Sequence, residues 1–159
     1  MTEHDPFLIA PELWFAVLCE GVRFDQRKRI DLRRVFSRLS IGQPPGWDLG
    51  PFAHLRAVLA VGYSYGVGEF SADISLQDVD GHVLWNRPKP WVFRVGPGDS
   101  TGVVLAEPVE YVFREPGNYY FVLRLTPPGS AEHRVRLEVA LPEASSSPEP
   151  PFAAPDQPQ

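Results

Sequence analysis

Apolar and polar side chains alternate with a period of two residues over most of this chain. This is the period of a β-strand that buries one face and leaves the other in water. The clearest example is Glu69–Gln77, in which every second residue from Phe70 to Leu76 is apolar and the residues between them are polar. No convincing stretch shows the 3.6-residue period of an amphipathic helix. The pattern therefore predicts an all-β protein.

Turn signals separate the alternating runs, and they draw on the 18 Pro and 13 Gly of the chain. Asp80-Gly81 between two such runs is a strong hairpin signal. Short strands that follow one another at this spacing are typical of antiparallel sandwiches. We expect an antiparallel β-sandwich of about eight strands with an immunoglobulin-like or similar topology. A closed barrel is the alternative.

Three runs carry more specific expectations. Val109–Leu125 has two apolar halves around Glu115–Asn118, which predicts two antiparallel strands joined by a tight turn. Leu13–Val22 is apolar on both sides, as in a central or doubly covered strand. Ile30–Ile41 alternates but slips by one residue, which predicts a single strand with a β-bulge near Arg33.

The 159 residues have the size of one domain. We expect an irregular leader over residues 1–12 and a β-sandwich over residues 13–141. Residues 142–159 are rich in Pro, Ser and Ala and poor in apolar side chains, so they predict a disordered C-terminal tail.

The formal net charge is −5, and part of it comes from acidic residues in the C-terminal stretch, which has no Lys or Arg. The rest of the chain shows no basic excess, so we expect no nucleic-acid partner. The N-terminus is acidic and its apolar runs are short, which predicts a cytoplasmic protein without signal peptide or membrane span. Cys19, the single cysteine, follows Val17 and Leu18 and is expected to be a small buried hydrophobe.

The sequence contains no recognisable catalytic constellation. Its four histidines have no metal-ligand spacing, no second cysteine completes a zinc site, and neither G-x-S-x-G nor a phosphate-binding Gly-rich loop is present. We therefore expect a non-enzyme without cofactor. Asp78-Val79-Asp80-Gly81 is similar to the start of a calcium loop, but the further ligands of such a loop are missing in register, so a plain hairpin turn is favoured and a cation site is the alternative.

Basic residues are concentrated in one part of the chain, where seven of the fifteen fall within sixteen positions. At a sheet edge such charges prevent edge-to-edge pairing. They also suit docking to an acidic partner, because guanidinium groups match carboxylate geometry. The candidate partner-binding residues are Arg23, Arg27, Arg29, Arg33, Arg34 and Arg38.

Aromatic residues in or beside loops, with Tyr63 and Tyr65 among them, suggest a second kind of site. Aromatic rings in such places can stack on sugars or anchor an interface. The candidate ligand-stacking residues are Trp47, Trp85 and Trp91.

The run from Trp14 to Leu39 resembles the first hairpin of a family of functionally uncharacterised bacterial β-sandwich proteins. The matching residues are Leu18, Cys19, Glu20, Val22, Arg23, Val35 and Phe36, and Pro116–Tyr119 before a late strand also matches. The resemblance implies a β-sandwich but brings no assigned catalytic or binding residue. The chain departs from the family pattern at Arg33-Arg34, where a small residue such as Gly is expected.

Together, these observations predict a non-catalytic protein-interaction or assembly module that binds another protein or a second copy of itself. The alternative is a carbohydrate-binding or small-ligand-binding module that uses exposed Trp and Tyr residues.

Overall fold

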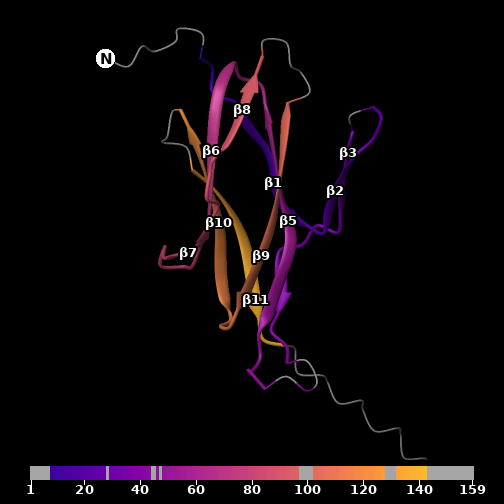
Figure 1. Ribbon diagram of the computed structural model, residues 1–159, viewed down its shortest axis with the longest axis vertical. Coiled ribbons are helices and arrows are strands. Elements are labelled where there is room, and N and C mark those ends of the chain that lie inside the picture. Colours follow the sequence, from indigo (N-terminus) through magenta and orange to yellow (C-terminus); the bar gives the residue numbers. More distant parts are fainter. Residues whose placement is uncertain are drawn as a thin grey trace, which may run out of the picture.

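The computed structural model describes residues 8–27, 29–43, 46, 48–96, 102–127 and 132–142. These residues form eleven strands and no helix, so the predicted all-β fold is confirmed. None of them belongs to a helix long and apolar enough to cross a membrane. Two sheets pack face to face, and a separate hairpin projects from one side of the sandwich (Figure 1).

The smaller sheet has three antiparallel strands in the order β1-β5-β9. β1 spans Glu12–Cys19, β5 spans Ala53–Ser64 and β9 spans Val103–Phe113. The bulged residue of β1 is Trp14, which interrupts the register between Leu13 and Phe15. β5 lies in the centre of this sheet and carries much of the core, because every second residue from Ala53 to Tyr63 points inward and is buried.

The larger sheet has the order β4-β11-β10-β6-β7, and β8 pairs with the other half of β6. Its pairings are antiparallel except for β4, which runs parallel to β11. In an immunoglobulin fold, strands A, B and E share one sheet and strands C, F and G the other. β1, β5 and β9 match the first set and β6, β10 and β11 the second, so the predicted topology is confirmed. The bounds are Arg38–Ser40 for β4, Gly68–Gln77 for β6, Val83–Asn86 for β7, Trp91–Val95 for β8, Gly117–Thr126 for β10 and Glu132–Ala140 for β11.

The projecting hairpin consists of β2 (Gly21–Phe24) and β3 (Ile30–Arg33), which pair only with each other. It lies on the side of the β1-β5-β9 sheet that faces away from the core (Figure 1). Two apolar pairs, Val22 opposite Leu32 and Phe24 opposite Ile30, lie on one side of its ladder. The pair between them, Arg23 opposite Asp31, is charged and lies on the other side. The hairpin is therefore an amphipathic arm outside the sandwich.

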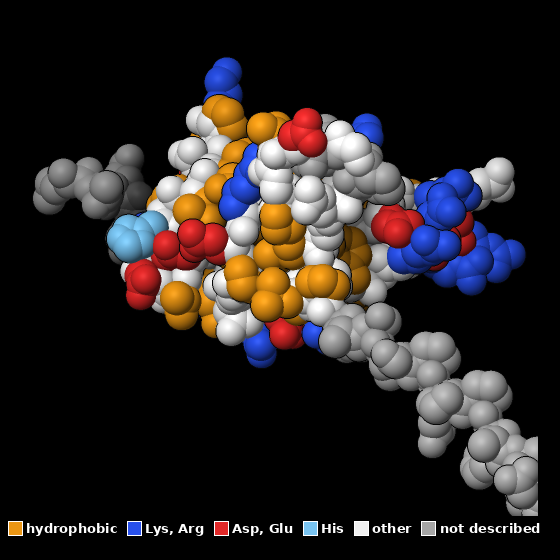
Figure 2. Space-filling model, turned by 90° about the horizontal axis from the view of Figure 1, so that it is seen from below, with side chains coloured by type: hydrophobic (Ala, Val, Ile, Leu, Met, Phe, Trp, Pro, Cys, Tyr) orange, Lys and Arg blue, Asp and Glu red, His pale blue; other side chains and the backbone are white. Residues whose placement is uncertain are grey.

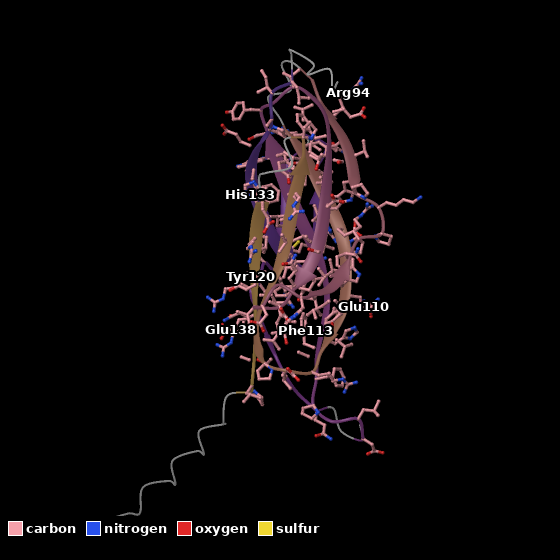
Figure 3. The ribbon with its side chains drawn as sticks, turned by 90° about the vertical axis from the view of Figure 1, so that its left-hand side faces the viewer. Arg94, Glu110, Phe113, Tyr120, His133 and Glu138 are labelled. Atoms are coloured by element: carbon pink, nitrogen blue, oxygen red, sulfur yellow. The ribbon has the colours of Figure 1, made fainter. Side chains whose placement is uncertain are left out.

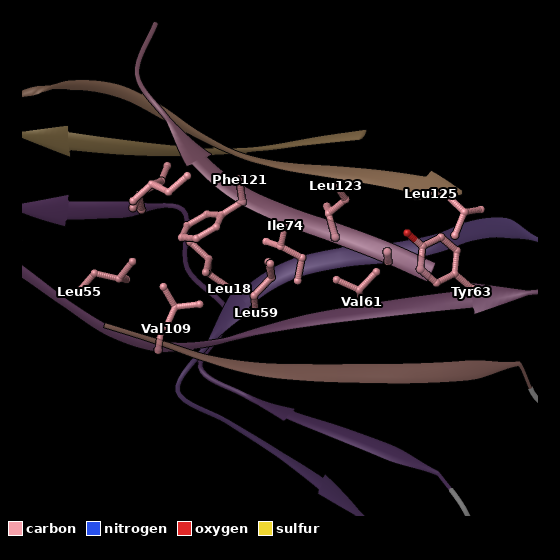
Figure 4. Packing of buried hydrophobic residues seen from close by; sticks show 14 of the residues in the cluster. Leu18, Leu55, Leu59, Val61, Tyr63, Ile74, Val109, Phe121, Leu123 and Leu125 are labelled. Atoms are coloured by element: carbon pink, nitrogen blue, oxygen red, sulfur yellow. The ribbon is translucent and has the colours of Figure 1, made fainter. Parts of the chain in front are cut away.

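The core lies between the two sheets and is built from the inward positions of both (Figure 4). Leu59 and Val61 of β5 face Ile74 of β6 and Phe121 of β10, and all four are almost completely buried. Tyr63 also lies in this core, stacked on Phe93 with ring centroids 5.3 Å apart. Cys19 is fully buried, as predicted, and burial raises the pKa of its thiol.

Two predicted strands are each divided in the structure. Leu13–Val22 breaks at Glu20, where β1 ends and the hairpin begins. Ile30–Ile41 breaks after Arg33, so the prediction of one bulged strand was wrong: the β2–β3 ladder has no register shift. The slip in alternation marks the point at which the chain leaves the hairpin for the larger sheet. Arg34 turns it there with a φ of 48°, in the left-handed region that favours glycine.

The predicted hairpin over Val109–Leu125 was also wrong. β9 pairs with β5 and β10 pairs with β6 and β11, so the turn carries the chain from one sheet to the other. The Tyr119 hydroxyl donates a hydrogen bond of 2.8 Å to the Glu115 carbonyl. This is the geometry of a tyrosine corner, which fixes the crossover before strand F of immunoglobulin-like sandwiches.

The predicted hairpin at Asp80-Gly81 is confirmed, and the two ends of the chain are described in part. β6 pairs with β7 around Asp80-Gly81, where Gly81 has a φ of 85°, and β10 pairs with β11. Of the predicted leader, Ile9 bridges Val67 and β1 begins at Glu12. Residues 1–7 and the predicted disordered tail from residue 143 onward lie outside the described residues.

Candidate protein-interaction surface

The outer face of the β1-β5-β9 sheet is apolar across all three strands. The inward residues of β5 include Leu59 and Val61, so Val58, Ala60 and Gly62 point outward. Their cross-strand neighbours on β1 and β9 are apolar as well. We call this set of outward residues the apolar face: Phe15, Val17, Cys19, Val58, Ala60, Gly62, Val104, Ala106 and Pro108.

The apolar face is compact and partly open to solvent. Ala106 and Pro108 are exposed, and Val17 and Val58 are half-buried. The Phe15 ring lies against Gly62, where a Cβ atom would collide with it. The β2–β3 hairpin lies on this side of the sheet, and β2 contacts β5 there (Figure 1). Cys19 and Ala60 are fully buried, so the exposed part of the apolar face lies on β9, at Ala106 and Pro108.

The outer face of the larger sheet is polar instead. Arg124 and Arg134 both pair with Glu132, at 3.0 and 3.1 Å, and the Arg134 guanidinium lies 5.9 Å from the centre of the Tyr120 ring. The Arg136 side chain donates to the Asn118 amide oxygen at 2.9 Å. Tyr120 and Glu138 lie in the sheet that faces the viewer in Figure 3.

An open groove of about 380 Å³ lies where the hairpin joins the sandwich. Arg34 of the β3–β4 link, Arg38 of β4 and Arg56 of β5 line it together. Its apolar lining is formed by the neighbouring residues Val35, Phe36 and Leu39. We call this site the arginine groove.

Glu20 and Glu110 each contact a basic side chain at the arginine groove. Glu20 lines it, with its Oε1 atom 3.3 Å from Nη1 of Arg34. The Nε2 atom of His54 lies 2.9 Å from Oε1 of Glu110, although Glu110 stands directly opposite Arg56 in the ladder. Three arginines, one histidine and one glutamate thus lie among the residues that line the arginine groove.

The six predicted partner-binding arginines do not form one surface. Arg34 and Arg38 line the groove, whereas Arg23 and Arg33 lie on the charged side of the hairpin. Toward the hairpin turn lie Arg27 and Arg29. Figure 2 shows Lys and Arg side chains gathered on the side from which the hairpin projects, with acidic side chains among them.

Asp25 organises the hairpin turn. It accepts the Arg29 side chain at 2.7 Å and the Arg27 and Arg29 backbone N–H groups at 2.8 Å. The bonds from Arg29 lower the pKa of the Asp25 carboxyl, and the Arg27 N–H lowers it further. Part of the basic run therefore has a structural role.

Sequence reasoning missed Arg56, whose only signal was a charge within the apolar run of β5.

The predicted stacking residues lie elsewhere. Trp85 and Trp91 are half-buried and pack against the core, and the Arg87 guanidinium lies 5.4 Å from the centre of the Trp91 ring. Tyr63 is buried, whereas Tyr65 is exposed. Trp47 lies outside the described residues. The structure thus offers the carbohydrate alternative no shared platform of described tryptophan rings.

The Asp78–His82 turn brings three potential metal ligands together. One ligand atom each of Asp78, Asp80 and His82 lies within 4.8 Å of the other two. Asp78 Oδ1 accepts the backbone N–H groups of Asp80 and His82, and its Oδ2 lies 2.9 Å from His82 Nδ1. Desolvation opposes ionisation of Asp78, but the His82 backbone N–H and ring outweigh it and lower the pKa. These bonds explain the cluster as a hairpin turn.

A smaller pocket of about 250 Å³ adjoins this turn and the tyrosine corner. Asp78, Tyr111 and Tyr119 are among the residues that line it. Desolvation raises the pKa of the Tyr119 hydroxyl, and the nearby Glu115 carboxylate adds to the shift. The hydroxyl already donates to the Glu115 carbonyl. Its contacts therefore serve the crossover between the sheets.

Comparison with known proteins adds no assignment to this geometry. No family model matches the chain, and no curated protein matches it either. The resemblance of residues 14–39 to a bacterial β-sandwich family therefore stays a prediction. Any functional conclusion must come from the surfaces described above.

Proposed function

We propose that this protein is a non-catalytic interaction or assembly module, and that its apolar face is the contact surface. An antiparallel sheet with one face in water normally carries polar residues on that face. The larger sheet follows this rule and the β1-β5-β9 sheet departs from it. The largest apolar patch on the surface of a monomer typically covers a few hundred Å² and is often a functional contact surface.

The pattern of β1 supports the same proposal. This strand is apolar on both sides, which is typical of a strand covered on both faces. In the structure it is the edge strand of the three-stranded sheet, and the larger sheet covers one of its two faces. A partner protein would cover the other face, and the partner is either a different chain or a second copy.

The size of the apolar face limits what it can do alone. The three outward residues on each strand span five positions, so the apolar face measures roughly 17 Å by 14 Å, or about 240 Å² in projection. A standard interface buries about 800 Å² on each partner. The apolar face is therefore the centre of a contact whose rim includes polar residues such as Arg56 and Glu110 beside it.

Matched charge substitutions on the two outer faces test the proposal. Val58 and Ser71 both point outward from central strands and both are half-buried. Val58→Asp should remove a stoichiometric partner from the tagged protein purified from its own cells, or dissociate a self-associated form in sedimentation. Ser71→Asp should leave either complex intact.

Equal complex formation by wild type and Val58→Asp, with both folded by circular dichroism, would contradict the proposed function. A monomer with no stoichiometric partner under all purification conditions would contradict it as well.

A further inference from the structure

The hairpin has an apolar side that its own two strands cover only in part. Val22 and Leu32 are half-buried, but Phe24, opposite Ile30 in the ladder, is 58% exposed. A two-stranded hairpin is marginally stable in water unless its apolar side packs on another element. β2 contacts β5, and from there the hairpin projects away from the sandwich (Figure 1). Its far end is therefore placed to reach the surface of another molecule.

Asp25 prepares the hairpin for such a contact. Its carboxylate accepts the backbone N–H groups of Arg27 and Arg29 and the side chain of Arg29, which fixes the turn. A segment that is already ordered loses less conformational entropy when it binds. The hairpin can therefore pack on a surface without first having to fold.

A second exposed aromatic residue lies at the outer face of the β1-β5-β9 sheet. Trp14, the bulged residue of β1, is 62% exposed, and its ring meets the Phe15 ring edge to face with centroids 5.4 Å apart. Phe15 lies against Gly62, which has no Cβ atom to displace it. Trp is highly buried on average and is enriched among the residues that dominate binding energy at interfaces. Trp14 therefore extends the apolar face at the β1 edge and offers an anchor.

The edges of this sheet are less suited to binding than its face. Pro108 lies within the edge strand β9 and has no N–H group to donate, and the bulge at Trp14 interrupts the edge strand β1. Prolines and bulges in edge strands prevent pairing with a further strand. We therefore expect a partner to cover the face rather than to extend the sheet.

The hairpin and the rest of the chain carry opposite net charges. Residues 21–33 contain five basic and two acidic residues, whereas all other residues together contain ten basic and eighteen acidic ones. The hairpin of one copy is therefore attracted to the body of another copy. The hairpin also lies on the same side of the sheet as the apolar face, so one twofold axis can bring each hairpin onto the other copy.

We propose that this protein forms a twofold dimer in which the hairpin of each copy packs its apolar side on the outer sheet face of the other, with Trp14 as the anchor. The inference rests on the proposed function and names its partner. The exposed part of the apolar face, at Ala106 and Pro108, is separated from Trp14 by the strand β5. Phe24 and Ile30 of the second copy cover the face between these points.

Sedimentation of the full chain over a range of concentrations tests the dimer. Phe24→Ser and Trp14→Ser should each weaken dimerisation by about tenfold or more, because each removes an exposed aromatic ring that the dimer buries. Val92→Ser is the matched control, since Val92 is 67% exposed on β8 of the larger sheet and should dimerise like wild type. All three variants should keep the circular dichroism of wild type. Added salt should also weaken the dimer, because salt screens the opposite charges.

Photo-crosslinking then locates the hairpin in the dimer. Benzoylphenylalanine replaces Phe24 in an equal mixture of isotope-labelled and unlabelled chains, and mass spectrometry identifies the joined peptides after irradiation. Adducts should join position 24 of one copy to β1 or β9 of the other, with mixed labels.

A monomer at all concentrations, a dimer that Phe24→Ser and Trp14→Ser leave unchanged, or adducts without mixed labels would overturn the inference. The proposed function would survive these results if Val58→Asp still removed a different stoichiometric partner. If Val58→Asp left every complex intact, the proposed function would fail, and the inference that rests on it would fail with it.

Discussion

The outward side chains of β5 and those of β10 differ in kind, although both strands lie inside their sheets and contribute to the same core. On β10 they include Tyr120 and Arg124, which contact charged residues of β11. On β5 they include Val58 and Ala60, which adjoin further apolar residues. Folding requires only the inward faces to be apolar. The difference between the outer faces is therefore evidence about binding.

The largest expected effect separates the two sides of β5. Leu59 is fully buried in the core, so Leu59→Ala should lower the free energy of unfolding by about 2–5 kcal/mol. Val58→Ala, on the adjacent outward residue, should lower it by less than about 1 kcal/mol, because only part of the side chain leaves water. Urea unfolding of both variants measures the contrast. Equal losses would mean that the chain itself covers the apolar face.

A second test concerns the inner side of the same strand. The Tyr63 hydroxyl is buried with no hydrogen-bond partner among the described residues, and desolvation raises its pKa to about 12. Because the folded state keeps this hydroxyl neutral, the free energy of unfolding has its full value below pH 10. It falls as pH rises toward 12, where the unfolded chain ionises and the folded chain resists ionisation. Over that range the loss should approach about 2 kcal/mol.

Tyr63→Phe should remove this part of the alkaline destabilisation. It should also raise the free energy of unfolding at pH 7 by roughly 1 kcal/mol, because an unsatisfied buried hydroxyl is removed. Unfolding curves at neutral and alkaline pH measure both effects. A less stable variant at neutral pH would show that the hydroxyl has a partner.

A third test concerns the crossover that connects the two sheets. Tyr119→Phe deletes the hydrogen bond to the Glu115 carbonyl and keeps the ring, so it should cost about 0.5–1.5 kcal/mol. Thermal unfolding measures the loss. No change in the unfolding temperature would mean that the ring alone holds the corner.

The smallest effect lies on the polar outer face. Hydrogen bonds from the Arg124 side chain, and then from Arg134, lower the pKa of Glu132. This contribution to stability is present above the ordinary Glu pKa and fades as pH falls through the lowered value. Arg124→Gln should move the pKa of Glu132 back up in an NMR titration. An unchanged pKa would show that the pair is not formed in solution.

Much of the fold followed from the alternation, because any strand that buries one face must repeat every two residues. Glu69–Gln77 shows this, since β6 spans Gly68–Gln77. Strand partners followed only in part, because the Asp80-Gly81 hairpin was predicted correctly but the one at Glu115–Asn118 was not. The Glu115–Asn118 turn has the residues of a hairpin, yet it joins two sheets, because pairing depends on which faces the core can bury.

The candidate site was predictable in part. Arg34 and Arg38 belonged to the conspicuous basic run, but Arg56 joins them only through the fold. The apolar face had a signal in Leu13–Val22, whose two apolar sides indicated a double cover. The structure supplies one of the two covers. Sequence periodicity alone cannot tell whether a second cover comes from the same chain.

Site-specific photo-crosslinking tests the central claim most directly. Benzoylphenylalanine at position 58 would sit on the apolar face, and at position 71 on the polar face, each in a central strand. Irradiation of cells that make each variant should give one adduct of defined mass from position 58 and none from position 71. Equal adducts from both positions, or none from position 58, would contradict the account.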